Sequence, residues 1–261
     1  SMGVVGAATA TTFSQALVTI VFIYFGKKNR EIYSKVKLLV KPDLQHIKKI
    51  IKLGVPPFVQ TAIHSGISMV LTRFIANFGD VAVAVINIGS QIESISWLSA
   101  EGFSSAISAF IGQNYGAKKM DRIKQGYRVG MQILGTIGFL ASLLLILGAE
   151  PLFGIFTPND PVAIREGIKY LKILGLSQFF MTAEIGTAGA FNGLGKTLPP
   201  TLIGIIFNLL RIPLAMWLSS TRLGLLGIWW AISISSIIKG IVSPCLYIYL
   251  LRNKLEAILN Y

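Results

Sequence analysis

Cysteine, histidine and charged residues are all scarce in this sequence of 261 residues. The single cysteine, Cys245, excludes an internal disulfide, and the two histidines, His46 and His64, lie too far apart to form a metal-ligand motif. No nucleophile-elbow or dinucleotide-binding motif is present. Hydrolytic and redox chemistry therefore lack their usual residues, so we expect no cofactor, no metal and no enzymatic activity.

Charged residues make up only 13% of the sequence, whereas a soluble domain carries about 25%. Hydrophobic residues make up 53%, and the mean hydropathy is +0.66. Residues 4–25 and 129–147 contain no charged residue. Because a helix needs about 20 apolar residues to cross a bilayer, we expect an all-α integral membrane protein, a polytopic bundle of helices that has the lipid bilayer as its partner.

The hydrophobic pattern predicts seven transmembrane helices. Short polar or glycine- and proline-rich stretches separate them. The predicted spans are residues 3–25, 54–78, 81–113, 127–148, 171–193, 198–218 and 223–250.

Basic residues outnumber acidic ones by 24 to 11, which gives a net charge of +13. Nucleic acid is not the expected partner, because an excess of Lys and Arg in a membrane protein marks its cytoplasmic loops. The basic residues gather in alternate loops, in 27–52, 118–128 and at Lys196, and at the C-terminus. We expect a multi-pass protein of the inner (cytoplasmic) membrane with a cytoplasmic C-terminus, and an amphipathic interfacial helix over residues 42–52.

The stretch "AGAFNGLGKTLPP" (188–200) ends like a nucleotide-binding phosphate loop. The first glycine of that motif is replaced by Ala190, and no strand is expected before it. Glycines are typical of helix ends, and Pro199 and Pro200 suit the first turn of the next helix. We therefore interpret the stretch as a cytoplasmic turn between two helices.

The span 81–113 carries polar residues along one face. They recur every seven residues, with others beside that line: Asn87, Ser94, Glu101 and Ser108, then Gln91, Ser104 and Ser105. Two interpretations stay open, a hydrogen-bonding seam between helices and a water-lined cavity. The two carboxylates, Glu93 and Glu101, favour the cavity.

The span 54–78 has a similar polar stripe, which includes Gln60 and His64. His64 is either a hydrogen-bonded core residue or a group that handles protons or substrate.

Glu184 is the one acidic residue deep in the span 171–193. A carboxylate at low dielectric can be poised to exchange a proton; alternatively Glu184 pairs with an arginine of another helix, Arg211 or Arg73. Lys239, in the last span, is expected to extend its ammonium to the membrane surface.

Four stretches, in this order and spacing, resemble the multidrug and toxic compound extrusion (MATE) transporters of bacterial type. Two of them, "GVVGAATATTFSQ" (3–15) and "LGVPPFVQ" (53–60), are similar to the starts of the sixth and seventh helices of that family. "IGQNYGAKKMDRI" (111–123) is similar to the end of the eighth helix, and "AFNGLGKTLPPTLIGIIFNLLRIPLA" (190–215) to the turn between the tenth and eleventh.

The resemblance implies two lobes of six helices and export of cationic drugs by antiport with protons or sodium. By this likeness residues 1–26 are the last helix of the N-terminal lobe, 27–53 a cytoplasmic basic linker with an amphipathic helix, and 54–261 the C-terminal lobe. The start Ser1-Met2-Gly3, directly before a span, indicates a fragment whose N-terminal lobe is missing.

The sequence departs from the family at a position of interest. Several members have a glutamate eight residues after the proline at the start of the seventh helix, and here that position is His64. The family acid of the tenth helix falls near Met181, about one turn before Glu184. Both departures disfavour sodium and favour proton coupling.

We expect Glu184 and Glu101 to carry the exchange between proton and drug. The expected lining of the substrate and ion pathway is Gln60, His64, Asn87 and Gln91, with Arg211 as a possible charge partner.

Two alternatives remain. A flippase for lipid-linked oligosaccharides, of the same superfamily, would need cavity arginines, for which only Arg73 and Arg211 are available. A seven-helix receptor or retinal protein would use Lys239 as its Schiff-base lysine.

Overall fold

The computed structural model describes residues 3–28 and 43–253, and the chain divides after residue 48 into two units that are described separately. Most of the predicted basic linker (29–42) and the C-terminal residues 254–261 lie outside the described residues. The first unit holds helix α1 (Gly3–Lys28), whose large apolar side chains are exposed. Residues 8–26 of this helix are long and apolar enough to cross a membrane, as the sequence predicts.

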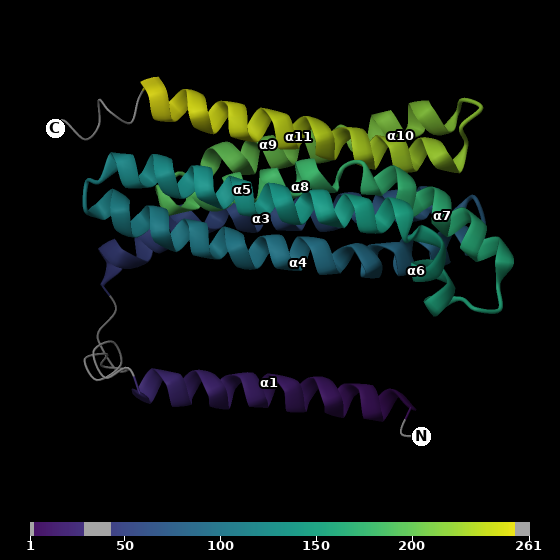
Figure 1. The fold of residues 1–261 in the computed structure, drawn as a ribbon, viewed down its shortest axis with the longest axis horizontal. Coiled ribbons are helices and arrows are strands. Elements are labelled where there is room, and N and C mark those ends of the chain that lie inside the picture. Colours follow the sequence, from purple (N-terminus) through teal and green to yellow (C-terminus); the bar gives the residue numbers. More distant parts are fainter. Residues whose placement is uncertain (1–2, 29–42, 254–261) are drawn as a thin grey trace. The chain divides into compact units, whose positions relative to one another are not determined.

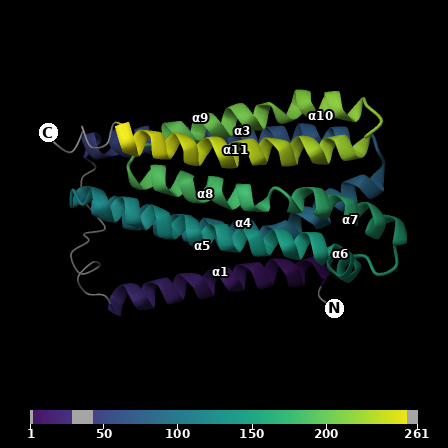
Figure 2. The same cartoon turned by 45° about the horizontal axis from the view of Figure 1, so that its top comes forward.

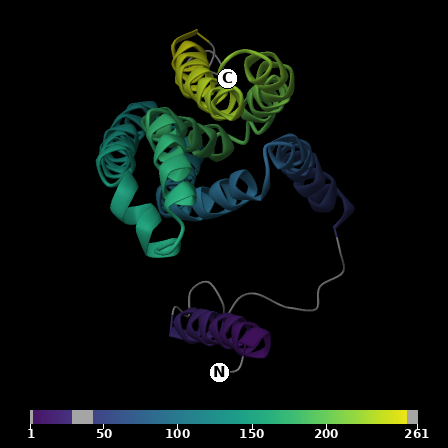
Figure 3. The same cartoon turned by 90° about the vertical axis from the view of Figure 1, so that its right-hand side faces the viewer.

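The described part of the second unit is helical apart from short turns (Figure 1). Its long helices run alongside one another in Figures 1 and 2, and Figure 3 shows them from one end. In chain order the helices are α3 (Leu44–Ala76), α4 (Asp80–Gly116), α5 (Met120–Leu147), α6 (Ala149–Phe156), α7 (Pro161–Gly175), α8 (Gln178–Gly193), α9 (Leu198–Leu209), α10 (Arg211–Ser219) and α11 (Leu225–Asn253).

Five segments of the described chain are long and apolar enough to span a membrane: 8–26 in α1, α4, α5, the pair α9–α10 over 198–219, and α11. The predicted count of seven is therefore not confirmed. Helix α8 has only 16 residues, about 24 Å at 1.5 Å per residue, which is shorter than a bilayer core of about 30 Å. Helix α3 begins with a strongly basic segment and carries polar side chains along its length.

Helix α3 differs from the sequence interpretation at its start. The amphipathic segment expected to form a separate helix is instead the first turns of α3, which continues through Pro56 and Pro57 to Ala76. A proline has no N–H to donate to the carbonyl four residues earlier, but its fixed φ is compatible with a helix. The two prolines therefore remove backbone hydrogen bonds without ending the helix.

Helix α8 packs against three long helices, α4, α5 and α11. Small residues permit the close approach to α4, because a Cβ on Gly189 or Gly193 would collide with the backbone carbonyls of Ser104 or Ser108. Such glycine contacts are typical of helix pairs in membranes.

The turn after α8 has the geometry of a Schellman motif. The amide of Lys196 donates to the carbonyl of Phe191 and that of Gly195 to Asn192, both at 2.9 Å, and Gly195 has a φ of +68°. Helix α9 then begins with Pro199 and Pro200 in its first turn. The predicted helix–turn–helix is confirmed, and the phosphate-loop interpretation is excluded because a helix, not a strand, precedes the glycines.

Two hydrophobic clusters occupy the two ends of the second unit. One includes Phe153 and Trp229, and the other includes Tyr127, Phe191 and Tyr247. Along α4 the first cluster ends at residue 92 and the second begins at 100; along α11 the corresponding residues are 232 and 246. The segments between them carry buried polar side chains, so a polar layer separates two apolar ends.

Candidate functional site

The polar layer brings four ionisable side chains from four different helices into the interior of the bundle. Neutral hydrogen-bonding side chains accompany them. We define the polar layer as Glu93 of α4, Tyr170 of α7, Gln178 and Glu184 of α8, Arg211 of α10, and Ser235, Ser236 and Lys239 of α11.

Glu184 forms an ion pair with Lys239, with 2.9 Å between Oε2 and Nζ. The two side chains are only 14% and 9% exposed. The expectation that Lys239 reaches the membrane surface is therefore wrong. Lys239 lies 14 residues from each end of α11 (225–253), about 21 Å at 1.5 Å per residue, which is beyond the reach of a lysine side chain. The arginine pairing considered for Glu184 is likewise replaced by this lysine.

Glu93 is held by neutral donors. The Tyr170 hydroxyl donates to its Oε1 at 2.6 Å, and the Gln178 amide donates to its Oε2 at 2.9 Å. Both donors come from helices distant in sequence, and Gln178 is fully buried. The sequence named Glu93 as a carboxylate that favours a cavity, but it gave no sign of these two partners.

Arg211, the first residue of α10, is buried and bound by two serines of α11. Its Nε donates to Ser235 Oγ at 2.6 Å, and its Nη2 donates to Ser236 Oγ at 3.0 Å. It also interacts electrostatically with Glu184 and Glu93. When all four groups are ionised, two carboxylates balance two cations, which is the condition under which charges are tolerated at low dielectric.

Two interrupted helices meet the polar layer. The helical path through α7 and α8 breaks at Leu176 and Ser177, directly before Gln178. The path through α9 and α10 breaks at Leu210, directly before Arg211, where Pro213 cannot donate to the carbonyl of residue 209. Interrupted helices at membrane depth line cavities and carry the binding sites of many transporters.

His64 lies beside the layer rather than in it. The side chain is exposed, its Nδ1 lies 3.4 Å from the Asn208 amide nitrogen, and it interacts electrostatically with Glu184. It borders a cavity of about 490 Å³ with Ser65, Ser68, Met69 and Thr72 of the same helix. Gln60, one turn earlier, is half-buried and packs on Gly204 of α9.

The remaining predicted residues are separate from the polar layer. Asn87, Gln91 and Glu101 are exposed on α4; we call them, with Ser94 and Ser108, the α4 stripe. A hydrogen-bonding seam does exist next to it, since Ser104 Oγ donates to the Ile185 carbonyl of α8 at 2.8 Å. Of the predicted residues, the structure thus brings Glu184 and Arg211 together in the polar layer and places His64 beside the layer. Glu101 lies apart from it.

No group of three or more His, Cys, Asp or Glu side chains suited to a metal ion is found among the described residues. What the polar layer can do is exchange charge. A proton, or a cation that competes with Lys239 for Glu184, would change the balance of charges inside the bundle.

A bundle of membrane-spanning helices with interrupted segments and a charged interior is the architecture of a membrane transporter. The MatE family model matches residues 56–217, and the chain belongs to this family, which confirms the resemblance seen in the sequence. Its members are transporters rather than enzymes, so the receptor interpretation of Lys239 is excluded.

Two relatives with assigned names carry the same likeness over most of the chain. A probable multidrug resistance protein NorM of Thermotoga maritima is 33% identical over 234 residues, which are 87% of this chain and 49% of that protein. The multidrug export protein MepA of Staphylococcus aureus is 24% identical over 97% of this chain and 55% of that protein. The chain therefore spans about half the length of the curated relatives it matches.

A solved structure of an outward-facing multidrug resistance MATE transporter of the MOP superfamily superposes with a TM-score of 0.86. The identity is 22%, and the match covers 97% of this chain and 57% of that one. At this identity the likeness shows the fold alone.

Proposed function

We propose that this chain is part of a secondary active transporter that exports cationic amphiphilic compounds by antiport with protons or sodium. The names of the NorM and MepA relatives support multidrug export. In this proposal residues 54–261 form one six-helix lobe, residues 1–26 the last helix of the other lobe, and 27–53 a cytoplasmic linker. The protein lies in the inner membrane with a cytoplasmic C-terminus, and its partners are cationic drugs, the coupling ion and the N-terminal lobe.

The buried ion pair between Glu184 and Lys239 is the observation that carries the proposal. A carboxylate whose counterion is a lysine can exchange that lysine for a proton or for a cationic substrate. Removing the lysine without a replacement would leave an uncompensated charge in a medium of low dielectric, which is costly. The layer therefore favours states in which Glu184 has one partner at a time. That partner is a proton, the Lys239 ammonium or a cationic substrate.

Alternating access follows from this competition. A ligand shifts an equilibrium between two conformations only by the difference in its affinity for them. Protonation of Glu184 removes its attraction for a cationic drug, and we expect that loss to release the drug on the outer side. Glu93 serves as a second proton acceptor. Its present partners are neutral donors, and a protonated Glu93 can still accept a hydrogen bond from one of them.

The substrate path in this proposal runs along the exposed polar groups. The α4 stripe, with Glu101, Asn87 and Gln91, offers hydrogen bonds to a substrate. Because these side chains are exposed, Glu101 needs no counterion from another helix. His64 and Gln60 of α3 line the path near the polar layer.

Protons are favoured over sodium as the coupling ion. The support is the departure at His64, which stands where several members of the family have a glutamate. Gln178 Oε1 and Asn208 Oδ1 are buried acceptors without a hydrogen-bond partner among the described residues, and neither of these two amide oxygens carries a charge.

The test is ethidium efflux from right-side-out membrane vesicles of a host that lacks its own multidrug pumps and expresses the complete gene product that contains this sequence. We compare Glu184→Gln with Glu166→Gln, a surface carboxylate of α7 that pairs with Lys169 at 2.8 Å. A proton gradient should drive efflux in the parent and in the Glu166 variant, and the Glu184 variant should lose it. A sodium gradient in place of the proton gradient decides the coupling ion.

Undiminished proton-driven efflux by the Glu184 variant would remove this carboxylate from the mechanism.

The flippase alternative gains no support, because its cavity arginines are not found together: Arg211 is buried with two serines, and Arg73 is exposed on α3.

A further inference from the structure

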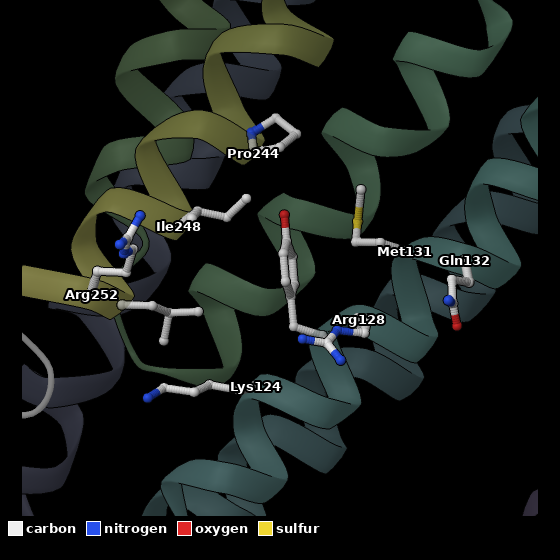
Figure 4. Close-up of a pocket in the computed structure, with 9 residues that line it drawn as sticks. Lys124, Arg128, Met131, Gln132, Pro244, Ile248 and Arg252 are labelled. Carbon is white, nitrogen blue, oxygen red and sulfur yellow. The ribbon is translucent and has the colours of Figure 1, made fainter.

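A groove between α5 and α11 lies apart from the polar layer, at the end of the bundle where α5 begins and α11 ends (Figure 4). Its volume is about 580 Å³. In Figure 4, Lys124, Arg128, Met131 and Gln132 come from α5, and Pro244, Ile248 and Arg252 from α11.

The wall of this groove is apolar and well supported. Pro244, Ile248 and Leu251 form the α11 side. Tyr127 lies at the α5 side, where its hydroxyl lies 3.0 Å from Thr187 Oγ1 and its ring packs 4.3 Å from the ring of Tyr247, centroid to centroid. A buried tyrosine that is fixed at both its hydroxyl and its ring gives the groove a firm floor.

The rim of the groove is cationic. Arg128 lies in the third turn of α5 and Arg252 in the last turn of α11, and Lys124 lies one turn before Arg128. All three side chains are exposed, and none of the nine residues that line the groove is acidic. A positive rim above an apolar wall, at the end of a membrane-spanning helix pair, is complementary to an anionic headgroup above an acyl chain.

We propose that this groove binds one anionic phospholipid. Its phosphate lies between Arg128 and Arg252, and one acyl chain follows Ile248 toward Pro244. Arginine binds phosphate oxygens with two parallel hydrogen bonds, and basic pockets between transmembrane helices bind anionic lipid headgroups. A zwitterionic lipid fits the same wall but brings its own cation to a rim that is already positive.

The test is native mass spectrometry of the purified chain in detergent, titrated with phosphatidylglycerol or with phosphatidylcholine of identical acyl chains. A surface-near arginine strengthens the binding of an anionic lipid about fivefold, so the two arginines predict a preference of roughly 25-fold for phosphatidylglycerol. The double variant Arg128→Gln/Arg252→Gln should lose most of this preference, since Lys124 is then the one cation left among the lining residues. The matched control Lys119→Gln, a cation at the same end of α5 that does not line the groove, should keep the preference.

Two further arms separate a lipid from a free anion. Ile248→Trp fills the groove from its exposed side and leaves the arginines in place, so it should weaken the binding of phosphatidylglycerol. Millimolar inorganic phosphate should compete poorly, because it has no acyl chain. Equal binding of both lipids by the parent chain, or an undiminished preference in the double arginine variant, would overturn the proposal. Full competition by phosphate together with an unaffected Ile248→Trp variant would assign the site to a free anion and overturn it as well. Unchanged helicity by circular dichroism confirms that each variant is folded.

Discussion

The polar layer and the α4 stripe look alike in the sequence and differ completely in the structure. Both contain carboxylates, amides or hydroxyls on helices predicted to cross the membrane, and the layer adds two cations, Arg211 and Lys239. In the polar layer Glu184 and Glu93 are mostly buried, and side chains of other helices bind both of them. In the stripe Asn87, Gln91 and Glu101 are exposed.

The difference teaches what a buried charge requires. A carboxylate inside the bundle persists only where another helix supplies a cation or two donors, so the members of the layer depend on one another. A carboxylate of the stripe carries no such dependence and remains available to a ligand. Substitutions in the two regions should therefore differ in their cost to stability, and each prediction below sets a buried group against an exposed counterpart.

The largest difference is expected for Lys239→Met, which leaves Glu184 without its cation. Loss of one member of a buried ion pair costs about 3–5 kcal/mol of unfolding free energy. The double variant Glu184→Leu/Lys239→Met removes both charges and should recover most of that loss, whereas Glu101→Gln in the stripe should change little. Thermal unfolding in detergent measures all three. A single variant as stable as the parent would show that Glu184 does not depend on Lys239 for its place in the bundle.

A smaller loss is expected for Tyr170→Phe, which removes the hydroxyl that donates to Glu93 at 2.6 Å. A buried carboxylate that loses one of its two donors costs about 3 kcal/mol. The ring and its edge-to-face contact with Trp229 are retained. Tyr249→Phe, at an exposed position of α11, is the control and should be neutral in the same unfolding measurement. Equal effects of the two substitutions would contradict the role given to the Tyr170 hydroxyl.

Two glycines extend the comparison to the backbone. A Cβ at Gly189 of α8 would collide with the Ser104 carbonyl, whereas a Cβ at Gly102, on α4, meets nothing within 4 Å. Gly189→Ala should therefore push α8 from α4 and cost about 2 kcal/mol. Gly102→Ala should stabilise by up to about 1 kcal/mol, because alanine is the better helix former. Unfolding of the two variants side by side checks the opposite signs, and a neutral Gly189→Ala would mean that α4 and α8 lie farther apart.

Most of the helices could be predicted from the sequence, because uncharged runs, and the glycines and prolines at helix ends, are local signals. Gly195, Pro199 and Pro200 located the turn between α8 and α9 correctly, and the turn before α4 was placed within a few residues. Helix α5 begins at Met120, seven residues before the predicted span 127–148. The break before Arg211 also had a local signal, because Pro213 lies within the predicted span 198–218 and disfavours an uninterrupted helix there.

The pairing of charges could not be predicted in the same way. Glu184 was identified as a buried acid, but its lysine lies 55 positions later (184 to 239). The partners of Glu93 lie 77 and 85 positions away. Which helices face each other is decided by packing, such as the glycine contacts of α8, and a single sequence carries no periodic signal for it. The prediction for Lys239 was wrong for this reason. With no partner visible in the sequence, a lysine that extends to the membrane surface was the simpler interpretation.

The smallest effect is expected at Asp43, an exposed charge whose partners are local. Asp43 Oδ1 accepts from the Gln45 amide at 2.9 Å and Oδ2 lies 2.6 Å from His46 Nδ1, at the start of α3. The His46 side chain and then the Gln45 amide hold the pKa of the Asp43 carboxyl below its ordinary value. A lowered carboxyl pKa stabilises the helix start above the unfolded value of about 3.9, and that stabilisation is lost as the pH falls through the lower, folded value.

Hydrogen exchange of the amides of Gln45 and His46, corrected for intrinsic rates, measures this contribution. Protection should be present at about pH 5, which lies above the unfolded carboxyl pKa of about 3.9, and should be lost as the pH falls below that value. Asp43→Ala should remove the protection at every pH, and His46→Ala should move its loss to a higher pH because the main cause of the lowered pKa is gone. Exchange that is the same in Asp43→Ala and in the parent would show that this exposed carboxylate, unlike those of the polar layer, contributes nothing to its helix.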